Sequence, residues 1–553
     1  MIPVSRECWL RPWQSATAGW VVTGVVLLAG APLFLCMPPW NDVTLHDMVV
    51  RSLVRGGVLY RDVFDTNLPG IDWAMAGVRL TLGWSYEALR AVDLAVIAAA
   101  VWLLAGWVRH GGGTPAAVAW LAAGVALFYP FSAEFNHVQR DPWLLLPATA
   151  AARMRLNRLQ TGGTAQAGAA LLEGLLWGSA VWIKPHVLVP AAAVWFVSAL
   201  LLRRSQPGRM LLGDLAQLVA GGLLAGLAGV AWLVATGAWP HFLDVFLNWN
   251  PDYLSNILSG AGFRLGRSLV CFGPWSYWHG VALPLALLAL GEAFRQPGDY
   301  PSRQRLPGWL YAPAESASVA NTRALLAALY LGWCAQGVLF QKAFDYVQVP
   351  MLLLALAVAA TQRWAIGCVG LVGSVLIGLV ASWSLLPLNR HPLTDPRVLE
   401  LWPRCWCEGG SPDLRNRLGH FTQTHWGTDW VSLDAVARFL RTVEPPLGPG
   451  ELNCWHDSTH PLYLMLDLDP ATRYMHYGTV FGIRKQAERI ASEVAASRQR
   501  YVVSDCLLKP TTDSAAPDLF PWNQPVVFET PRYRVHEVRN PLGVIDIPDA
   551  ASR

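Results

Sequence analysis

The chain has 553 residues, of which 53% are hydrophobic and only 14% are charged. A soluble protein carries about a quarter charged residues, so this composition excludes an ordinary soluble enzyme and indicates a polytopic membrane protein. The net charge is only +4, which argues against a nucleic-acid partner. The 28 tryptophans fit a membrane protein, because Trp favours the membrane–water interface.

Eleven apolar runs have the length, about 15 to 25 residues, that a membrane-spanning helix needs. They lie at 16–37, 88–108, 114–131, 142–155, 165–183, 186–202, 211–235, 276–294, 323–340, 346–361 and 364–386. No A-x-A cleavage site follows the first run, so we expect a permanent helix rather than a signal peptide. The sequence thus predicts an α-helical membrane domain of about 11 transmembrane helices over residues 1–386.

The arginines predict the orientation of these helices. If the N-terminus, with Arg6 and Arg11, faces the cytoplasm, alternate connectors hold most of the remaining arginines, as the positive-inside rule requires. The opposite, extracytoplasmic side then receives several polar breaks and the C-terminal region. These breaks are 38–86, 132–141, 184–185, 237–275 and 341–346. We expect a multi-pass protein of the bacterial inner membrane with this side in the periplasm.

Residues 387–553 are polar, rich in proline and broken by turns, which predicts a small periplasmic α/β domain. Hydrophobic periodicity predicts helices at 429–443 and 484–497 and strands at 463–468, 501–507, 525–529 and 533–538. The region has no G-x-G-x-x-G or P-loop motif, so no nucleotide site is expected. Disulfides are possible if the domain faces an oxidising compartment, among Cys405, Cys407, Cys454 and Cys506. No Cys and His spacing resembles a zinc site, and we expect no cofactor.

The stretch Pro38–Asp72 carries more charge than a connector needs. Its ionisable residues include Asp42, His46, Asp47, Arg51, Arg55, Arg61, Asp62, Asp65 and Asp72. Asp42 directly follows the first apolar run, so it is either a helix N-cap or a general base. Asp47 is four residues before Arg51 and is expected to pair with it. His46 shares a helix face with Asp42, although a lone histidine is more often structural.

Three further breaks place ionisable groups on the same side of the membrane. The 132–141 loop includes His137, Arg140 and Asp141, Lys184 precedes Pro185 at the end of an apolar run, and Lys342 and Tyr346 occupy a similar break. Charges near membrane depth are costly and tend to be functional, although Lys184 could also snorkel to the interface. A transporter places its ionisable groups near the midplane, where this chain has almost none. The pattern therefore favours chemistry at the membrane surface.

Four motifs, in chain order, resemble GT-C fold glycosyltransferases, the class of the protein O-mannosyltransferases and the lipid A aminoarabinose transferases. The motifs are Asp42 with Arg51, Gly56 and Tyr60-Arg61-Asp62; Gln139-Arg140-Asp141; Lys184-Pro185; and Gln341-x-x-Phe344-x-Tyr346-x-x-x-Pro350. The resemblance covers roughly residues 15–390. It implies a GT-C fold and an enzyme that transfers a hexose or pentose from a polyprenyl-phosphate donor to a lipid, glycan or protein acceptor, with inversion.

The resemblance also implies roles for individual residues. Asp42 would be the general base, and Arg140, Lys184 and Lys342 would bind the donor phosphate. Supporting or substrate-contacting residues would be His46, Arg51, Tyr60, Asp62, His137, Asp141 and Tyr346. Val43 stands where many members of the family carry Glu, and Val347 stands where some carry His. Paired carboxylates are therefore not expected beside Asp42, and we predict no metal.

Two other functions stay open at the level of the sequence. One is a transporter or flippase that moves lipid-linked sugars without chemistry, and the other is a non-catalytic assembly protein of the cell envelope whose C-terminal domain binds partners. Product formation by the purified protein would separate an enzyme from a transporter. Loss of function on deletion of 390–553, but not in Asp42→Asn, would favour the assembly protein.

Overall fold

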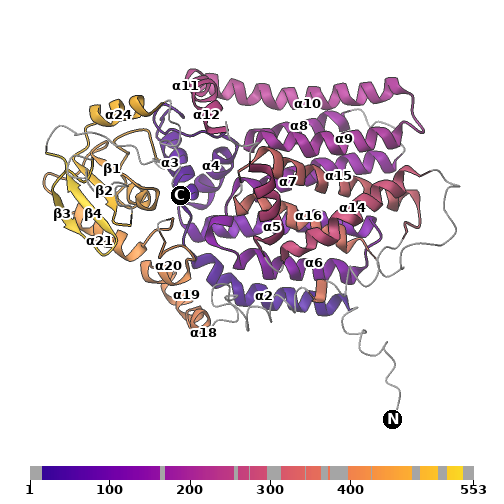
Figure 1. The fold of residues 1–553 in the computed structure, drawn as a ribbon, viewed down its shortest axis with the longest axis horizontal. Helices are drawn as coiled ribbons and strands as arrows, with labels where there is room; N and C mark the ends of the chain where they lie inside the picture. Colours follow the sequence, from indigo (N-terminus) through magenta and orange to yellow (C-terminus); the bar gives the residue numbers. More distant parts are fainter. Residues whose placement is uncertain are drawn as a thin grey trace, which may run out of the picture.

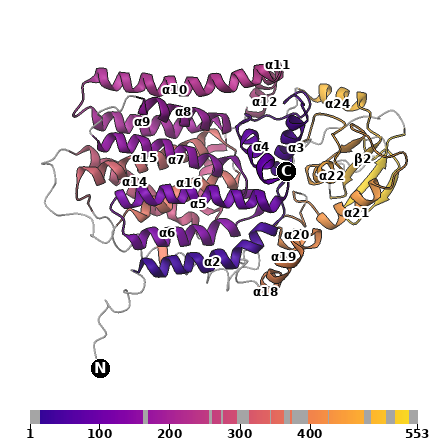
Figure 2. The ribbon, with the colours of Figure 1, turned by 180° about the vertical axis from the view of Figure 1, so that it is seen from behind.

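The computed structural model describes most of the chain, and every statement below refers to the residues that it describes. These are 15–161, 168–254, 260–272, 275–295, 313–342, 344–362, 371–373, 396–424, 426–475, 486–507 and 520–539. A bundle of long helices forms one part of the molecule, and the C-terminal region lies against one end of it (Figures 1 and 2). Two shorter helices, α3 and α4, lie between the two parts in both views.

The bundle consists of helices that run in the same general direction, with α10 along one edge and α2 along the opposite edge (Figure 1). Its long helices are α2 (Ala16–Cys36), α5 (Tyr86–His110), α6 (Pro115–Phe128), α7 (Arg140–Gln160), α8 (Ala169–Ile183), α9 (Leu188–Leu202), α10 (Gly208–Ala235), α14 (Trp278–Phe294), α15 (Ala317–Phe340) and α16 (Asp345–Ala360). Short elements connect them: η2 (Tyr129–Phe131), η3 (Glu134–Asn136), η4 (Pro185–Val187), α11 (Trp239–Asp244), η5 (Val245–Trp249), α12 (Asn250–Leu254), α13 (Ala261–Val270) and η7 (Trp275–Tyr277).

Six of the described helices are long and apolar enough to cross a membrane, and a bent pair, Pro115–Phe131 with Glu134–Gln160, would make a seventh. Helices α8 and α16 are apolar but shorter. The multi-pass membrane character that the composition indicates is therefore confirmed, whereas the count of about 11 stays a prediction. The apolar run at 364–386 falls outside the described residues except for 371–373.

Helices α8 and α10 approach each other through glycines. A Cβ atom on Gly174 would lie 2.0 Å from the carbonyl oxygen of Leu218, and one on Gly221 would lie 2.0 Å from that of Leu171. Real Cβ atoms are not found at such distances, so these positions require glycine. Small residues that let two backbones come this close are typical of packed membrane helices.

A buried charge network joins α7, α8 and α10. Arg155 Nη2 lies 2.9 Å from Glu173 Oε2, and both side chains are 1% exposed. Arg158 Nη1 lies 3.2 Å from the same oxygen, and both arginines also pair with Asp214. Two guanidinium groups therefore balance two carboxylates, and removal of one carboxylate would leave an uncompensated buried charge.

We expect Glu173→Ala to lower the free energy of unfolding by about 3–5 kcal/mol, because it leaves the buried guanidinium groups of Arg155 and Arg158 with one carboxylate fewer than they need for charge balance. Thermal unfolding of the purified chain in detergent measures this loss. The matched control is Asp434→Ala, whose half-exposed carboxylate pairs with Arg438 on the surface and should change stability by less than about 0.5 kcal/mol. Equal effects of the two substitutions would contradict a stabilising role of the network.

The C-terminal region is built on a four-stranded sheet in the order β1-β2-β4-β3, with β1 parallel to β2 and the other pairs antiparallel. Its elements are α18 (Pro396–Leu399), α19 (Trp402–Glu408), α20 (Pro412–Leu418), α21 (Trp430–Leu440), β1 (Leu452–Cys454), η10 (Asp457–Thr459), α22 (Pro461–Met465), α24 (Ala487–Ala496), β2 (Tyr501–Asp505), β3 (Val526–Glu529) and β4 (Tyr533–Glu537). Strand β2 is buried along its whole length, its polar residues Ser504 and Asp505 included.

Both predicted helices and three of the predicted strands of this region are confirmed, within a few residues. The predicted strand at 463–468 is wrong. Pro461 occupies the first turn of a helix, where its fixed φ is favourable and its missing N–H has no cost, and α22 follows. The three-residue strand β1 was not predicted, because it is too short to show a period. The cysteines of the region that the structure describes, Cys405, Cys407, Cys454 and Cys506, are free thiols.

Helix α3 (Asn41–Val54) runs from the end of the bundle along the C-terminal region, and α4 (Gly70–Leu82) packs beside it. Trp40, not Asp42, is the N-cap residue of α3, and Asp42 lies in the first turn. The helix ends before Gly56, whose φ of +83° suits glycine.

The expected pair between Asp47 and Arg51 is not formed. Asp47 instead makes a buried ion pair with Arg79 of α4, with 2.6 Å between Oδ2 and Nη2. Arg51 turns to the C-terminal region and donates to the carbonyl oxygens of Tyr463, at 2.7 Å, and Leu468. The C-terminal region therefore accepts the hydrogen bonds of the Arg51 guanidinium, which does not pair with Asp47.

Candidate active site

Two adjoining cavities lie at the end of the helix bundle, and α3 and the C-terminal region contribute to the wall of the first one only. The first, called here the Asp42 cavity, has a volume of about 510 Å³, and the second, the Lys184 cavity, has about 480 Å³. The side chains common to both walls are those of Thr66, Asn67, Arg140, Phe344 and Tyr346. Because five residues line both cavities, the two cavities adjoin each other at this shared wall.

The Asp42 cavity combines ionisable side chains with aromatic ones and is closed partly by the C-terminal region. The residues of its wall besides the shared ones are Trp40, Asn41, Asp42, Leu45, His46, Phe64, Asp65, Phe135, Arg267, Asp345, Phe421, Trp426 and Asp457. Glu134 holds the C-terminal side in place, because its carboxylate accepts hydrogen bonds from the backbone N–H groups of His420 and Phe421, each at 2.9 Å. Asn41 donates to the carbonyl oxygen of Trp426, also at 2.9 Å.

The Lys184 cavity combines cationic groups with an apolar wall. Its cations are Lys184 and Lys342, besides the shared Arg140, and α11, η5 and α12 supply Phe242, Val245, Phe246, Leu247 and Leu254. Lys184 lies where α8 ends, since Pro185 cannot continue the helix and opens η4 instead. The break that the sequence indicated at this position is confirmed, and it sets the ammonium at the end of the bundle.

Lys184 is held by a buried carboxylate. Its Nζ lies 2.6 Å from Asp141 Oδ2, and Gln341 donates to Asp141 Oδ1 at 3.2 Å. Burial lowers the pKa of Lys184 to about 8, although Asp141 opposes this shift. Burial also lowers the pKa of Lys342 to about 8. Both cations therefore exchange their protons close to neutral pH.

A tight turn that begins at Tyr60 positions Thr66 and Asn67 in the shared wall. Tyr60 has a φ of +68°, a conformation that is costly for a non-glycine residue. Its ring is buried, and its hydroxyl donates to the carbonyl oxygen of Asn67 at 2.7 Å. The backbone N–H and the side-chain amide of Asn67 donate to Asp65 Oδ1 at 3.1 and 2.7 Å. The segment from Tyr60 to Asn67 is thus fixed by its own hydrogen bonds.

The cavities bring together most of the predicted site residues. Asp42, His46, Arg140 and Tyr346 line the first, and Tyr60, Arg140, Lys184, Lys342 and Tyr346 line the second. Asp141 lies behind Lys184, as described above. The other three predicted residues, Arg51, Asp62 and His137, lie outside both walls.

Arg51 contacts the C-terminal region, and Asp62 forms a surface ion pair with Arg61, with 2.7 Å between Nε and Oδ1. His137 is fully buried, accepts a hydrogen bond from Arg90 at 2.9 Å and contacts the carbonyl oxygen of Tyr129. These contacts give all three residues a structural explanation.

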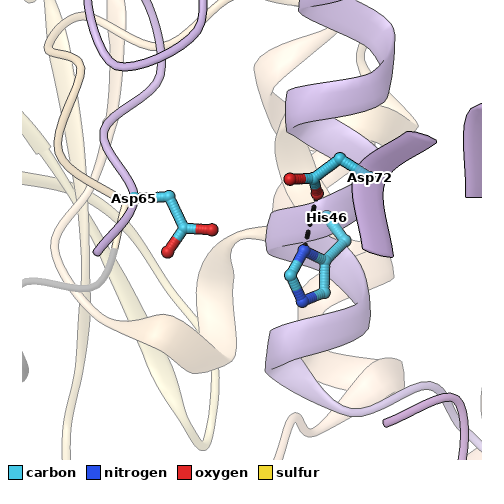
Figure 3. Close-up of side chains that lie close together, drawn as sticks. All are labelled: His46, Asp65 and Asp72. Atoms are coloured by element: carbon cyan, nitrogen blue, oxygen red, sulfur yellow. Dashed lines mark hydrogen bonds and ion pairs between the residues drawn. The ribbon is translucent and has the colours of Figure 1, made fainter. Parts of the chain in front are cut away.

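Two carboxylates to which the sequence assigned no role lie beside His46. Its Nδ1 is 2.7 Å from Asp72 Oδ1, and the carboxylate of Asp65 points toward this pair (Figure 3). His46 and Asp65 belong to the wall of the Asp42 cavity. Both aspartates are visible in the charged stretch after the first apolar run, but 19 and 26 positions separate them from His46, so no local spacing rule connects them.

No model of a protein family matches the chain, and none of the curated proteins matches it in sequence. Among solved structures it is similar to two crystal structures of the oligosaccharyltransferase of Archaeoglobus fulgidus. The form tethered to an acceptor peptide with an NVT sequon gives a TM-score of 0.41 at 12% identity, over 88% of this chain and 69% of that chain. The form in complex with Zn and sulfate gives a TM-score of 0.38 at 14% identity, over 88% and 68%. At these scores the likeness extends neither to individual residues nor to activity.

Proposed function

We propose that the chain is a GT-C type membrane glycosyltransferase that moves a sugar from a polyprenyl-phosphate donor to an acceptor hydroxyl with inversion. The observation that supports this best is the pair of cavities with a common wall. A transfer reaction needs two substrates that meet at one point, and here a carboxylate lies on one side of that wall and cations lie on the other.

The Lys184 cavity suits the donor. Phosphate would lie among Lys184, Lys342 and Arg140, and the apolar side chains of α11 to α12 would contact the lipid tail. The ammonium of Lys184 has three N–H donors, so it can keep its bond to Asp141 and still donate to a phosphate oxygen. The pair with Asp141 then holds Lys184 in position for the ligand.

The Asp42 cavity suits the acceptor. Its hydroxyl oxygen would attack the anomeric carbon at the shared wall, while the bond from that carbon to the phosphate oxygen breaks and the bonding electrons leave with the lipid phosphate. Asp42 would take the hydroxyl proton as general base, and Arg140 and Lys184 would stabilise the leaving phosphate. Attack from the side opposite to the leaving group inverts the anomeric centre. The acceptor would be a glycan, a lipid or a protein.

The motif resemblance and the polar loops at one end of the bundle also support a site on the extracytoplasmic face. In a bacterial inner membrane this face is the periplasm, and the region 387–553 would form a periplasmic domain over the Asp42 cavity. The residues of this region that line the cavity are Phe421, Trp426 and Asp457. The domain would then help to enclose the acceptor.

The purified full-length chain in proteoliposomes, given a radiolabelled polyprenyl-phosphate sugar and a cell-envelope extract as acceptor, tests this function. We expect the label to move to the acceptor fraction with release of one polyprenyl phosphate per sugar transferred. A flippase would instead move the labelled lipid between leaflets with its sugar–phosphate bond intact. That result would overturn the proposal.

The pH dependence of the donor KM above neutral pH tests the role of Lys184. A lysine with a pKa near 8 is charged below this pH and neutral above it, so its protonated fraction falls about tenfold between pH 7 and pH 9. We expect the donor KM to rise over this range and the rise to move to higher pH in Lys184→Arg, because a guanidinium stays charged. The double variant Lys184→Arg/Lys342→Arg should flatten the profile further. Identical pH profiles for all three proteins would contradict phosphate binding by these lysines.

A further inference from the structure

His46 of α3, Asp65 of the following segment and Asp72 of α4 converge on one point (Figure 3). One ligand atom from each residue lies within 4.8 Å of the other two. Donors that bind one ion at about 2.1 Å in a tetrahedral arrangement are about 3.4 Å apart, so small side-chain rotations would bring these three atoms to that spacing.

The three side chains are almost completely buried: His46 is 3% exposed, Asp65 is 4% and Asp72 is 1%. Two carboxylates buried together repel each other, and one imidazolium can balance only one of them. In the described part of the chain, Asp65 Oδ2 has no hydrogen-bond partner although it is buried. A buried carboxylate oxygen without a partner costs free energy, and a bound cation or a proton would remove this cost.

We propose that His46, Asp65 and Asp72 bind one divalent transition-metal ion, with Zn²⁺ as the best match. One imidazole nitrogen and two carboxylate oxygens are a common ligand set for Zn²⁺, whereas Mg²⁺ prefers oxygen ligands alone. A charge of +2 balances two carboxylates beside a neutral imidazole. Val43 leaves Asp42 without a carboxylate at the next position in the sequence. Asp72 of α4 and Asp65 of the segment after α3 supply carboxylates that no local spacing reveals.

The metal site does not depend on the proposed function, but it would deepen it. His46 and Asp65 belong to the wall of the Asp42 cavity, so an ion bound to them is accessible from that cavity. Three protein ligands leave a coordination position open, as in catalytic zinc sites. If the proposed function holds, an acceptor hydroxyl at that position would lose its proton to Asp42 more readily.

Metal analysis of the full-length protein in detergent tests the site. The chain is stripped with EDTA, loaded with Zn²⁺, Mn²⁺ or Mg²⁺ alone, and measured by mass spectrometry of bound metal and by titration calorimetry. We expect one Zn²⁺ per chain and a higher Tm after loading. Asp65→Asn and Asp72→Asn should each weaken Zn²⁺ binding at least about 100-fold and abolish the Tm shift. The control Asp434→Asn, which changes a half-exposed carboxylate on α21, should bind Zn²⁺ like the wild type.

Three results would overturn the metal site. They are a stripped wild-type chain that takes up none of the three ions, Zn²⁺ stoichiometry and affinity unchanged in Asp65→Asn and Asp72→Asn, or loss of binding in Asp434→Asn to the same extent. His46→Gln provides a third variant if an aspartate variant does not fold, which size-exclusion chromatography in detergent shows. Zn²⁺ binding without sugar transfer would refute the proposed function and leave the metal site intact. Sugar transfer by a chain that takes up none of the three ions would do the reverse.

Discussion

We expect Asp42→Asn to lower the rate of the proposed sugar transfer by about 10²–10⁴-fold while the chain stays folded, because an amide cannot accept the hydroxyl proton. The position is suited to this substitution: Asp42 is half-buried in the wall of its cavity, and Trp40 rather than Asp42 is the N-cap of α3. Initial rates in proteoliposomes and the Tm in detergent measure the two effects separately.

The matched control is Asp47→Asn, five positions further along the same helix. Asp47 pairs with Arg79 in a buried contact away from both cavities. Its loss should lower the free energy of unfolding by about 3–5 kcal/mol and leave the transfer rate of the folded fraction nearly unchanged. Full activity of Asp42→Asn would refute Asp42 as the base, and a large loss of rate in Asp47→Asn would show that the effect comes from the helix.

Arg140→Gln has the second-largest expected effect, a loss of about 10²–10³-fold in kcat/KM. Arg140 is the first residue of α7 and belongs to the walls of both cavities, so in the proposed reaction its guanidinium would lie beside the bond that breaks. Arg140→Lys keeps the charge but loses the two-pronged geometry, and it should recover part of the activity. Steady-state kinetics with varied donor measure both variants.

Arg61→Gln is the control for Arg140. Arg61 lies in the first loop, pairs with its neighbour Asp62 at the surface and lines neither cavity. Its substitution should change kcat/KM less than about twofold, since an exposed pair contributes little. Equal losses in Arg61→Gln and Arg140→Gln would mean that general positive charge, rather than the position of Arg140, supports the reaction.

The C-terminal region cannot be removed without altering the site. Phe421 and Trp426 line the Asp42 cavity, and Glu134 holds the backbone of the segment that carries them. Deletion of 390–553 would therefore open the cavity as well as remove any surface for partners. An assembly function is tested better by point substitutions at exposed positions of strand β3, such as Val527→Asp.

Features that depend on local chemistry could be predicted from the sequence. The glycine after α3 and the proline after Lys184 set the ends of two helices, because each residue restricts the backbone on its own. Apolar length predicted long helices, and β-branched and aromatic runs predicted β2, β3 and β4. These signals each lie within about ten residues.

Features that depend on distant partners could not be predicted. Asp47 has an arginine four residues later, yet its partner is Arg79, since α4 packs beside α3 and buries the pair. Segment 463–468 has the composition of a strand, but tertiary packing and Pro461 favour a helical turn. Asp65 and Asp72 were visible only as charges. Their approach to His46 follows from the turn that begins at Tyr60, which no local pattern specifies.

A density map of the full-length chain with a bound polyprenyl-phosphate sugar would show directly where the donor binds. We expect a phosphate in the Lys184 cavity within ion-pair distance of Arg140 and Lys184, with the anomeric carbon at the shared wall and facing Asp42. A lipid phosphate bound elsewhere on the bundle, with both cavities filled only by solvent, would contradict this expectation.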